Sequence, residues 1–122
     1  MKVHFYYRMR GDRPVVDFIE NTENEKHQNK IFKMIEKLEN NGLHLLQTND
    51  AEKIKKNLYE LKIEYGKIFY RIFFTTTQDY YCLIHAFSKK TNKTPPKEIN
   101  KAEVVKENLE LRIKQNNYNF NK

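Results

Sequence analysis

The fold of this protein is decided by residues 58–88, LYELKIEYGKIFYRIFFTTTQDYYCLIHAFS. Three runs can be distinguished in it, at residues 58–65, 68–76 and 80–88. Apolar and charged side chains alternate in the first run, which is typical of a strand with one buried face. The other two runs are apolar almost throughout, as in central strands. Gly66 and Gln78-Asp79 supply the turns, so the stretch predicts an antiparallel β-meander.

A strand and two helices are expected before the meander. Residues 2–9 alternate between apolar and polar side chains, as in a half-buried strand. Pro14 stands where the first position of a short helix would be. Thr22 and Glu25 have the capping-box spacing that opens a second helix, which should end at Asn40-Asn41-Gly42.

One more helix is expected after the meander. Thr94 should cap it, with Pro95 near its first position. Its apolar face is formed by Ile99, Ala102, Val105, Leu109 and Ile113. The polar tail that follows, residues 115–122, is expected to be flexible.

These elements together predict an α+β fold: a small antiparallel β-meander sheet with two N-terminal helices packed on one face and a C-terminal helix. Residues 1–122 are expected to form a single domain, because a chain of this length has room for one core and not for a second. Residues 43–50 give no clear assignment.

The net positive charge is confined to the second half of the chain. Residues 1–50 contain eight basic and eight acidic side chains, whereas residues 51–122 contain fifteen basic and eight acidic ones and carry the whole net charge of +7. A basic half favours a polyanionic partner, nucleic acid before membrane, because no amphipathic apolar anchor accompanies it. Charge alone leaves a second interpretation open, which is an ordinary lysine-rich surface that keeps the protein soluble.

Cysteine and histidine usage argues against a disulfide framework and against a metal site. Cys82 is the only cysteine, so a reducing cytoplasm is expected. Cys82 and His85 are three positions apart in a strand, so they should point to opposite faces and chelate poorly. We expect neither metal nor cofactor. The charged N-terminus does not suit a signal peptide, and no stretch approaches the roughly 20 apolar residues of a membrane helix.

Charged side chains interrupt the apolar strands and indicate a site. Arg71 lies within IFYRIFF, where a charge is unfavourable unless it is paired or faces a cleft. Strand parity allows five side chains to project together: Glu60, Lys62, Arg71, His85 and Lys89. If Arg71 faces an open cleft, it has no carboxylate partner. The alternative is a buried Arg71–Glu60 salt bridge, with His85 as a core histidine.

This group of residues suits the cleavage of RNA without a metal. A base must take the proton of the 2′-hydroxyl, cations must stabilise the phosphorane charge, and an acid must serve the 5′ oxygen. The candidate cations are Arg71, Lys62, Lys89 and Lys90, and the candidate base and acid are Glu60 and His85. The same patch suits simple nucleic-acid binding, with base stacking on Tyr6, Tyr81 or Phe87.

Four segments, taken in this order, resemble the phage-related branch of the RelE/HigB toxins, which are ribosome-dependent mRNA endonucleases of bacterial type II toxin–antitoxin pairs. The segments are residues 11–18 (GDRPVVDF), 58–62 (LYELK), 70–74 (YRIFF) and finally 85–91 (HAFSKKT), which is followed by 93–95 (KTP) and 98–99 (EI). The resemblance spans most of the chain. It implies a β-meander with two N-terminal helices on one side and a basic cleft on the other.

The resemblance also implies roles for individual residues. Arg71 matches the family's central-strand arginine, which binds the scissile phosphate. Lys89 and Lys90 match the basic pair after the last strand and, with Lys93, would clamp the RNA backbone. Lys62 falls where relatives usually carry an arginine, which keeps the charge but loses the bidentate fork. The resemblance carries over Glu60 and His85 without deciding which is base and which is acid.

The activity that the resemblance implies is metal-independent endoribonuclease cleavage of mRNA in the ribosomal A site. The expected partners are a cognate helix-turn-helix antitoxin that covers the basic cleft, the ribosome with its mRNA, and operator DNA through the antitoxin complex. One alternative is a non-catalytic nucleic-acid-binding module that acts in repression with its antitoxin. Another is a plain interaction domain whose positive charge is incidental.

Overall fold

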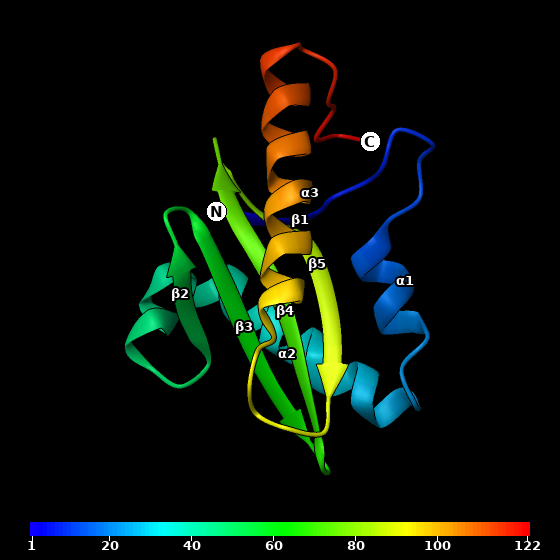
Figure 1. Cartoon of the computed structure of the whole chain (residues 1–122), viewed down its shortest axis with the longest axis vertical. Helices are drawn as coiled ribbons and strands as arrows, with labels where there is room; N and C mark the ends of the chain where they lie inside the picture. The colour runs from blue at the N-terminus through cyan, green and yellow to red at the C-terminus, as the bar shows by residue number, and fades with distance from the viewer.

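A five-stranded sheet forms the centre of the computed structural model, which describes residues 1–122 (Figure 1). The spatial order is β1-β5-β4-β3-β2. The strands are β1 (Lys2–Phe5), β2 (Ala51–Lys55), β3 (Leu58–Tyr65), β4 (Ile68–Thr77) and β5 (Tyr80–Lys89). Strands β2 to β5 pair antiparallel in chain order, and β1 pairs parallel with β5. The predicted meander is confirmed, and β2 extends it at one edge.

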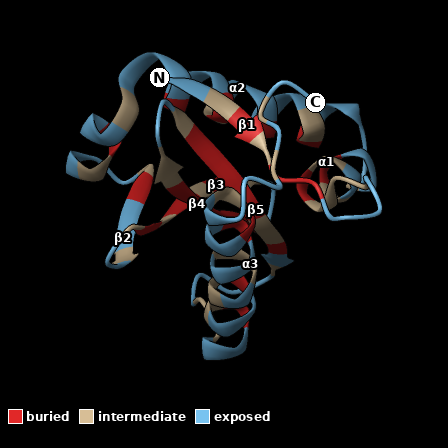
Figure 2. Cartoon of the chain, turned by 90° about the horizontal axis from the view of Figure 1, so that it is seen from above, coloured by how far each residue is buried: buried red, intermediate tan, exposed pale blue.

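The helices cover both faces of this sheet (Figures 1 and 2). They are α1 (Pro14–Glu20), α2 (Glu25–Asn41), the 3-10 helix η1 (Gly42–Gln47) and α3 (Pro96–Lys114). Helices α1 and α2 pack on one face, where Ile19, Ile31 and Leu38 join the inward side chains of the meander in the larger core. Helix α3 crosses the other face, where Ala102 and Leu109 join a smaller core. The predicted α+β class is confirmed.

Residues with a left-handed backbone close the tight turns. Gly66 has φ +64° between β3 and β4, and Gly42 has φ +58° at the end of α2, where glycine avoids the Cβ strain of that conformation. Asn57 has φ 52° between β2 and β3, and its amide side chain bonds to Thr76 of β4. These turns keep β2, β3 and β4 in register.

Two of the predicted helix caps are wrong. Asn24, not Thr22, caps α2, because its side-chain oxygen accepts hydrogen bonds from the amides of Lys26 and His27. The α3 helix begins after Pro95, with no side-chain cap. The Thr94 hydroxyl is turned toward the sheet and donates to a carboxylate there, which matters for the candidate site.

The expectation of a flexible tail is also wrong. The Tyr118 ring stacks on Tyr7 with 4.4 Å between ring centroids, and its hydroxyl lies 2.6 Å from Nε2 of His4. Phe120 stacks on Tyr80 at 4.6 Å. The two aromatic side chains therefore fix the tail against β1 and β5, despite the asparagines between them.

No helix of the chain combines the length and the apolar character that crossing a membrane requires.

Candidate functional site

The candidate site is built on the face of the sheet that α3 covers. In the β3–β4 register, Lys62 lies opposite Arg71, and Glu60 lies opposite Phe73. Alternation along the strands therefore places Glu60, Lys62 and Arg71 on the same face. Glu60 is 1% exposed and Arg71 is 4% exposed. Two opposite charges are thus buried side by side in the middle of the sheet.

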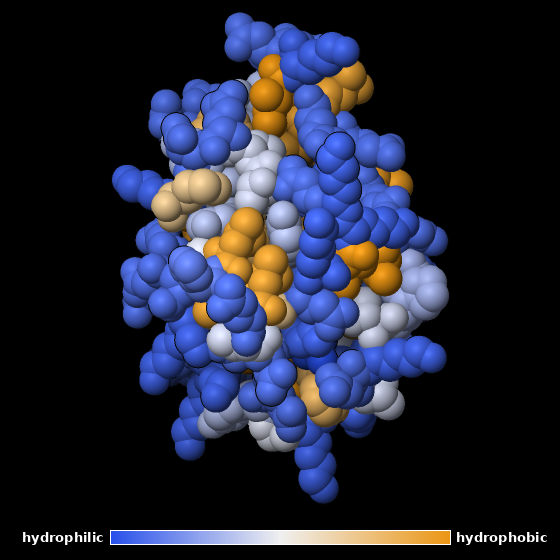
Figure 3. All heavy atoms as spheres, turned by 90° about the vertical axis from the view of Figure 1, so that its left-hand side faces the viewer, coloured by the Kyte–Doolittle hydropathy of each residue, from blue (hydrophilic) through white to orange (hydrophobic).

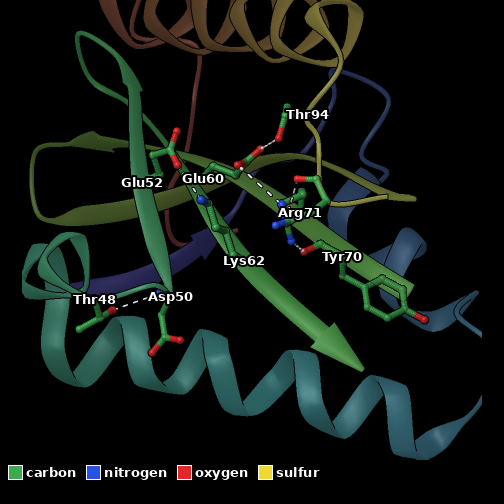
Figure 4. A network of polar contacts seen from close by, with 9 residues as sticks. Thr48, Asp50, Glu52, Glu60, Lys62, Tyr70, Arg71 and Thr94 are labelled. Carbon is green, nitrogen blue, oxygen red and sulfur yellow. Dashed lines mark hydrogen bonds and ion pairs between the residues drawn. The ribbon is translucent and has the colours of Figure 1, made fainter. Parts of the chain in front are cut away.

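Arg71 is surrounded by hydrogen-bond acceptors (Figure 4). Its Nε lies 3.7 Å from Oε1 of Glu60, and one terminal nitrogen donates to the backbone oxygen of Tyr70 at 3.2 Å. The other terminal nitrogen donates to both oxygens of Asn92, at 3.3 Å to the backbone oxygen and at closer range to the side-chain Oδ1. The expectation that Arg71 has no carboxylate partner is therefore wrong, and the alternative, a buried Arg71–Glu60 pair, is what the structure contains.

Burial shifts the protonation equilibria of both partners. Desolvation raises the pKa of Glu60 above its ordinary range, and the hydrogen bond from Thr94 and the charge of Arg71 only partly offset this. Desolvation also lowers the pKa of Arg71, although the Glu60 charge opposes the change. Thr94 Oγ1 donates to Oε2 of Glu60 at 2.7 Å. The site therefore holds a carboxylate that is more basic than an exposed one.

Lys62 stands at the edge of this cluster. Its Nζ lies 2.6 Å from Oε1 of Glu52 on β2, and its side chain remains 31% exposed. Lys62, Arg71 and Asn92 are among the residues that line a cavity of about 450 Å³, together with Lys30 and Met34 of α2. Arg71 lines this cavity although it is only 4% exposed.

His85 belongs to a second cluster. Its Nε2 lies 2.8 Å from Oε1 of Glu98 in the first turn of α3, and its ring stacks on Phe73. Burial alone would raise the pKa of Glu98, but the hydrogen bond and charge of His85 and the charge of Lys101 bring it below its ordinary range. Phe73 lies between Glu60 and His85 in the strand register, so the structure does not bring these two groups into contact.

A β-bulge on β5 sets the direction of His85. Phe73 pairs with His85 but Phe74 pairs with Leu83, which leaves one extra residue on β5. Cys82 packs in the core under α3, and His85 meets α3 through Glu98, so the two share a face. The expectation that they point to opposite faces is wrong. Burial raises the pKa of the Cys82 thiol to about 11.

The predicted lysines of the clamp lie at and after the end of β5. Lys89 is half-buried opposite Phe69 of β4, and Lys90 and Lys93 are exposed. No carboxylate lies within ion-pair distance of these three ammonium groups. On the side of the molecule that carries β2, the surface is mostly hydrophilic, with small, separate apolar areas (Figure 3).

The predicted stacking residues do not form part of an open surface. Tyr6, Tyr81 and Phe87 are 5%, 7% and 8% exposed. Tyr81 and Phe87 of β5 and Tyr6, which follows β1, fill the two cores, so the suggestion that they stack on bases is wrong. Sequence reasoning also missed Asn92, which contacts Arg71, and Glu98, which contacts His85. Glu98 stands one helical turn after the proline pair, but no sequence signal indicates Asn92.

The chain is thus a small α+β protein with a buried charge pair beside a cationic loop. Residues 17–107 match the model of the family described as Phage derived protein Gp49-like (DUF891). The match extends from α1 through β5 into α3, so it includes every predicted site residue. The chain belongs to this family. No curated protein matches it.

Proposed function

We propose that this protein is the toxin of a type II toxin–antitoxin pair and cleaves mRNA on the ribosome. Membership of the Gp49-like family supports the toxin assignment, because this family groups with toxins of the HigB-like and RelE-like kind. The observation that carries the proposal is the pairing of Arg71 with Glu60 on a face bordered by the three lysines of the clamp. A carboxylate base beside a guanidinium fits attack of a 2′-hydroxyl on phosphate.

Glu60 is the proposed general base. Its carboxylate takes the proton of the 2′-hydroxyl, the 2′ oxygen bonds to the adjacent phosphorus, and the bond from phosphorus to the 5′ oxygen breaks. The products are a 2′,3′-cyclic phosphate and a 5′-hydroxyl. The raised pKa of Glu60 supports this role, because a desolvated carboxylate holds a proton more strongly than an exposed one.

Arg71 is the proposed stabiliser of the phosphorane charge. Its guanidinium is held in place by contacts on each nitrogen, so the cation is positioned before substrate arrives. Lys62 and Lys89 add positive charge on the same face. His85 is the proposed acid for the 5′ oxygen, held by Glu98, and Lys90 and Lys93 are proposed to bind the flanking backbone.

The proposed partner is a helix-turn-helix antitoxin that covers this basic face, and the two proteins together would bind their operator DNA. An acidic segment of the antitoxin would form ion pairs with the unpaired lysines after β5. We expect a short helix-turn-helix reading frame beside the gene for this chain.

Induced expression without the antitoxin tests the proposal. Growth should stop, and mRNAs should be shortened at codon-spaced positions. Arg71→Lys should retain only part of the toxicity, because an ammonium cannot reproduce the planar fork. Arg112→Lys is the matched control, since Arg112 is equally buried at 4% exposed but bonds to Tyr7 instead of the site. Normal growth with abundant wild-type protein would contradict catalysis and favour the binding module.

A further inference from the structure

The segment between β5 and α3 lies directly over the charge pair of the candidate site. Its inward side chains are Asn92 and Thr94, and Lys93 between them is exposed. Asn92 contacts Arg71, while Thr94 contacts Glu60. Two side chains of the same short segment thus engage both charged groups. The contact of Thr94 with Glu60 can be followed in Figure 4.

The contact between Asn92 and Arg71 resembles the way a phosphate would be held. One guanidinium nitrogen of Arg71 faces two oxygens, the backbone carbonyl of Asn92 and its side-chain Oδ1. Two phosphate oxygens would use the same donors in the same way. Because Arg71 is only 4% exposed, a phosphate cannot reach that nitrogen while both Asn92 oxygens occupy it.

Asn92 is well placed to leave this position. Asn92 is itself exposed and contacts the buried Arg71, so it lies between Arg71 and solvent. It also lines the cavity that Lys62 and Arg71 line. The segment belongs neither to β5 nor to α3, so no ladder or helical hydrogen bond has to break when Asn92 moves. A neutral amide oxygen is also a weaker acceptor for a guanidinium than an anionic phosphate oxygen.

We infer that Asn92 is a built-in competitor for RNA phosphate on Arg71, so that substrate binding displaces it and opens the segment from Asn92 to Thr94. The inference rests on the proposed function for the identity of the phosphate ligand. Displacement moves Lys93 with the segment, which couples the exposed clamp to the buried pair. It also releases Oε2 of Glu60 from Thr94, which frees the carboxylate to act as a base.

Opposite changes at Asn92 test this inference. The probe is a 2′-O-methyl RNA of about ten nucleotides, which no 2′-hydroxyl attack can cleave, with affinity measured by fluorescence anisotropy at fixed salt. Asn92→Ala removes one competing oxygen and should bind the probe about 5-fold more tightly. Asn92→Asp strengthens the competitor and should bind at least 10-fold more weakly.

A matched control separates competition from general charge repulsion. Thr91→Asp places the same negative charge one residue earlier, at an exposed position that makes no hydrogen bond to Arg71. It should weaken binding clearly less than Asn92→Asp does. Equal loss in the two aspartate variants would overturn the inference, even if Asn92→Ala failed to fold. Wild-type or weaker affinity in a folded Asn92→Ala protein would overturn it as well.

The growth assay separates this inference from the proposed function. If the wild type is toxic and its Asn92→Ala variant binds the RNA probe no more tightly, Asn92 is not a competitor for phosphate, but the proposed toxin function stands. If the wild type is not toxic but its Asn92→Ala variant binds the RNA probe about 5-fold more tightly, the proposed toxin function is wrong. Competition between Asn92 and phosphate at Arg71 is then still supported.

Discussion

The two faces of the sheet are buried by different means. Under α1 and α2, the hydrophobic cluster has fourteen buried residues, including Ile72 and Phe74 of β4, and the buried His27 of α2 bonds to its Tyr70. Under α3, the apolar cluster has eight residues, and the four buried charged side chains of the molecule lie beside it: Glu60, Arg71, Glu98 and Arg112. One strand, β4, thus presents an apolar row to one side and Arg71 to the other. We therefore expect the first face to supply most of the stability, and we place the proposed chemistry on the second.

The largest expected effect is on the apolar face. Phe74→Ala should reduce the free energy of unfolding by about 4 kcal/mol, because Phe74 is 0% exposed and its removal leaves a cavity among rigid neighbours. Phe32→Ala is the control, since Phe32 is 45% exposed on α2, and it should cost less than about 1 kcal/mol. Urea unfolding measures both. A similar small loss for the two variants would contradict the assignment of stability to this face.

The next effect is on the charged face. Arg71→Ala should reduce the free energy of unfolding by about 3 kcal/mol, because it strands the buried Glu60 carboxylate without a cation. Lowering the pH should recover part of this loss, since protonation removes the uncompensated charge. Unfolding curves at neutral and acidic pH check this. An unchanged stability at neutral pH would show that the pair is not buried in solution.

A smaller effect concerns His4, which fixes the tail to β1. Burial, with the Arg13 charge, lowers the pKa of His4 from 6.5 to about 4. As pH falls from about 6.5 to about 4, the unfolded chain takes up a proton at His4 that the folded chain does not, so stability falls by roughly 2 to 3 kcal/mol. His4→Asn should remove this part of the pH dependence, whereas His44→Gln, at an exposed position, should not. Parallel pH profiles for His4→Asn and wild type would contradict the account.

The smallest effect on stability is expected at the clamp. Replacing Lys89, Lys90 and Lys93 by alanine should leave the free energy of unfolding within about 0.5 kcal/mol, because none is paired with a carboxylate. The logarithmic salt dependence of single-stranded RNA binding should decrease by about 0.7 for each lysine removed. An unchanged slope in the triple variant would show that these lysines do not bind RNA and only form an ordinary solvated surface.

The features that could be predicted from the sequence are those that follow from strand or helix periodicity. The meander and the amphipathic α2 and α3 follow from regular patterns, whereas β2 was missed because AEKIK is a short, mostly exposed edge strand. The β5 bulge was missed because no residue type marks it. Without the bulge, the shared face of Cys82 and His85 could not be predicted either. The tail looked polar by composition, although two aromatic side chains suffice to fix it.

The candidate site was only partly accessible from the sequence. Strand parity correctly placed Glu60, Lys62 and Arg71 on one face. It could not show that a loop residue, Asn92, completes the surroundings of Arg71, because loops have no periodicity. Thr94 looked like a helix cap, since a threonine before proline often is one, but the buried Glu60 carboxylate needs a donor and obtains it from that hydroxyl.

The double variant Arg71→Met with Glu60→Leu shows whether the charge pair is kept for function and not for stability. Replacing a buried ion pair by apolar side chains of similar volume is often neutral or stabilising by about 1 to 4 kcal/mol. Stability and growth arrest should be measured on this variant together. We expect a free energy of unfolding at or above that of the wild type, with no toxicity. A stable double variant that still arrests growth would contradict this expectation.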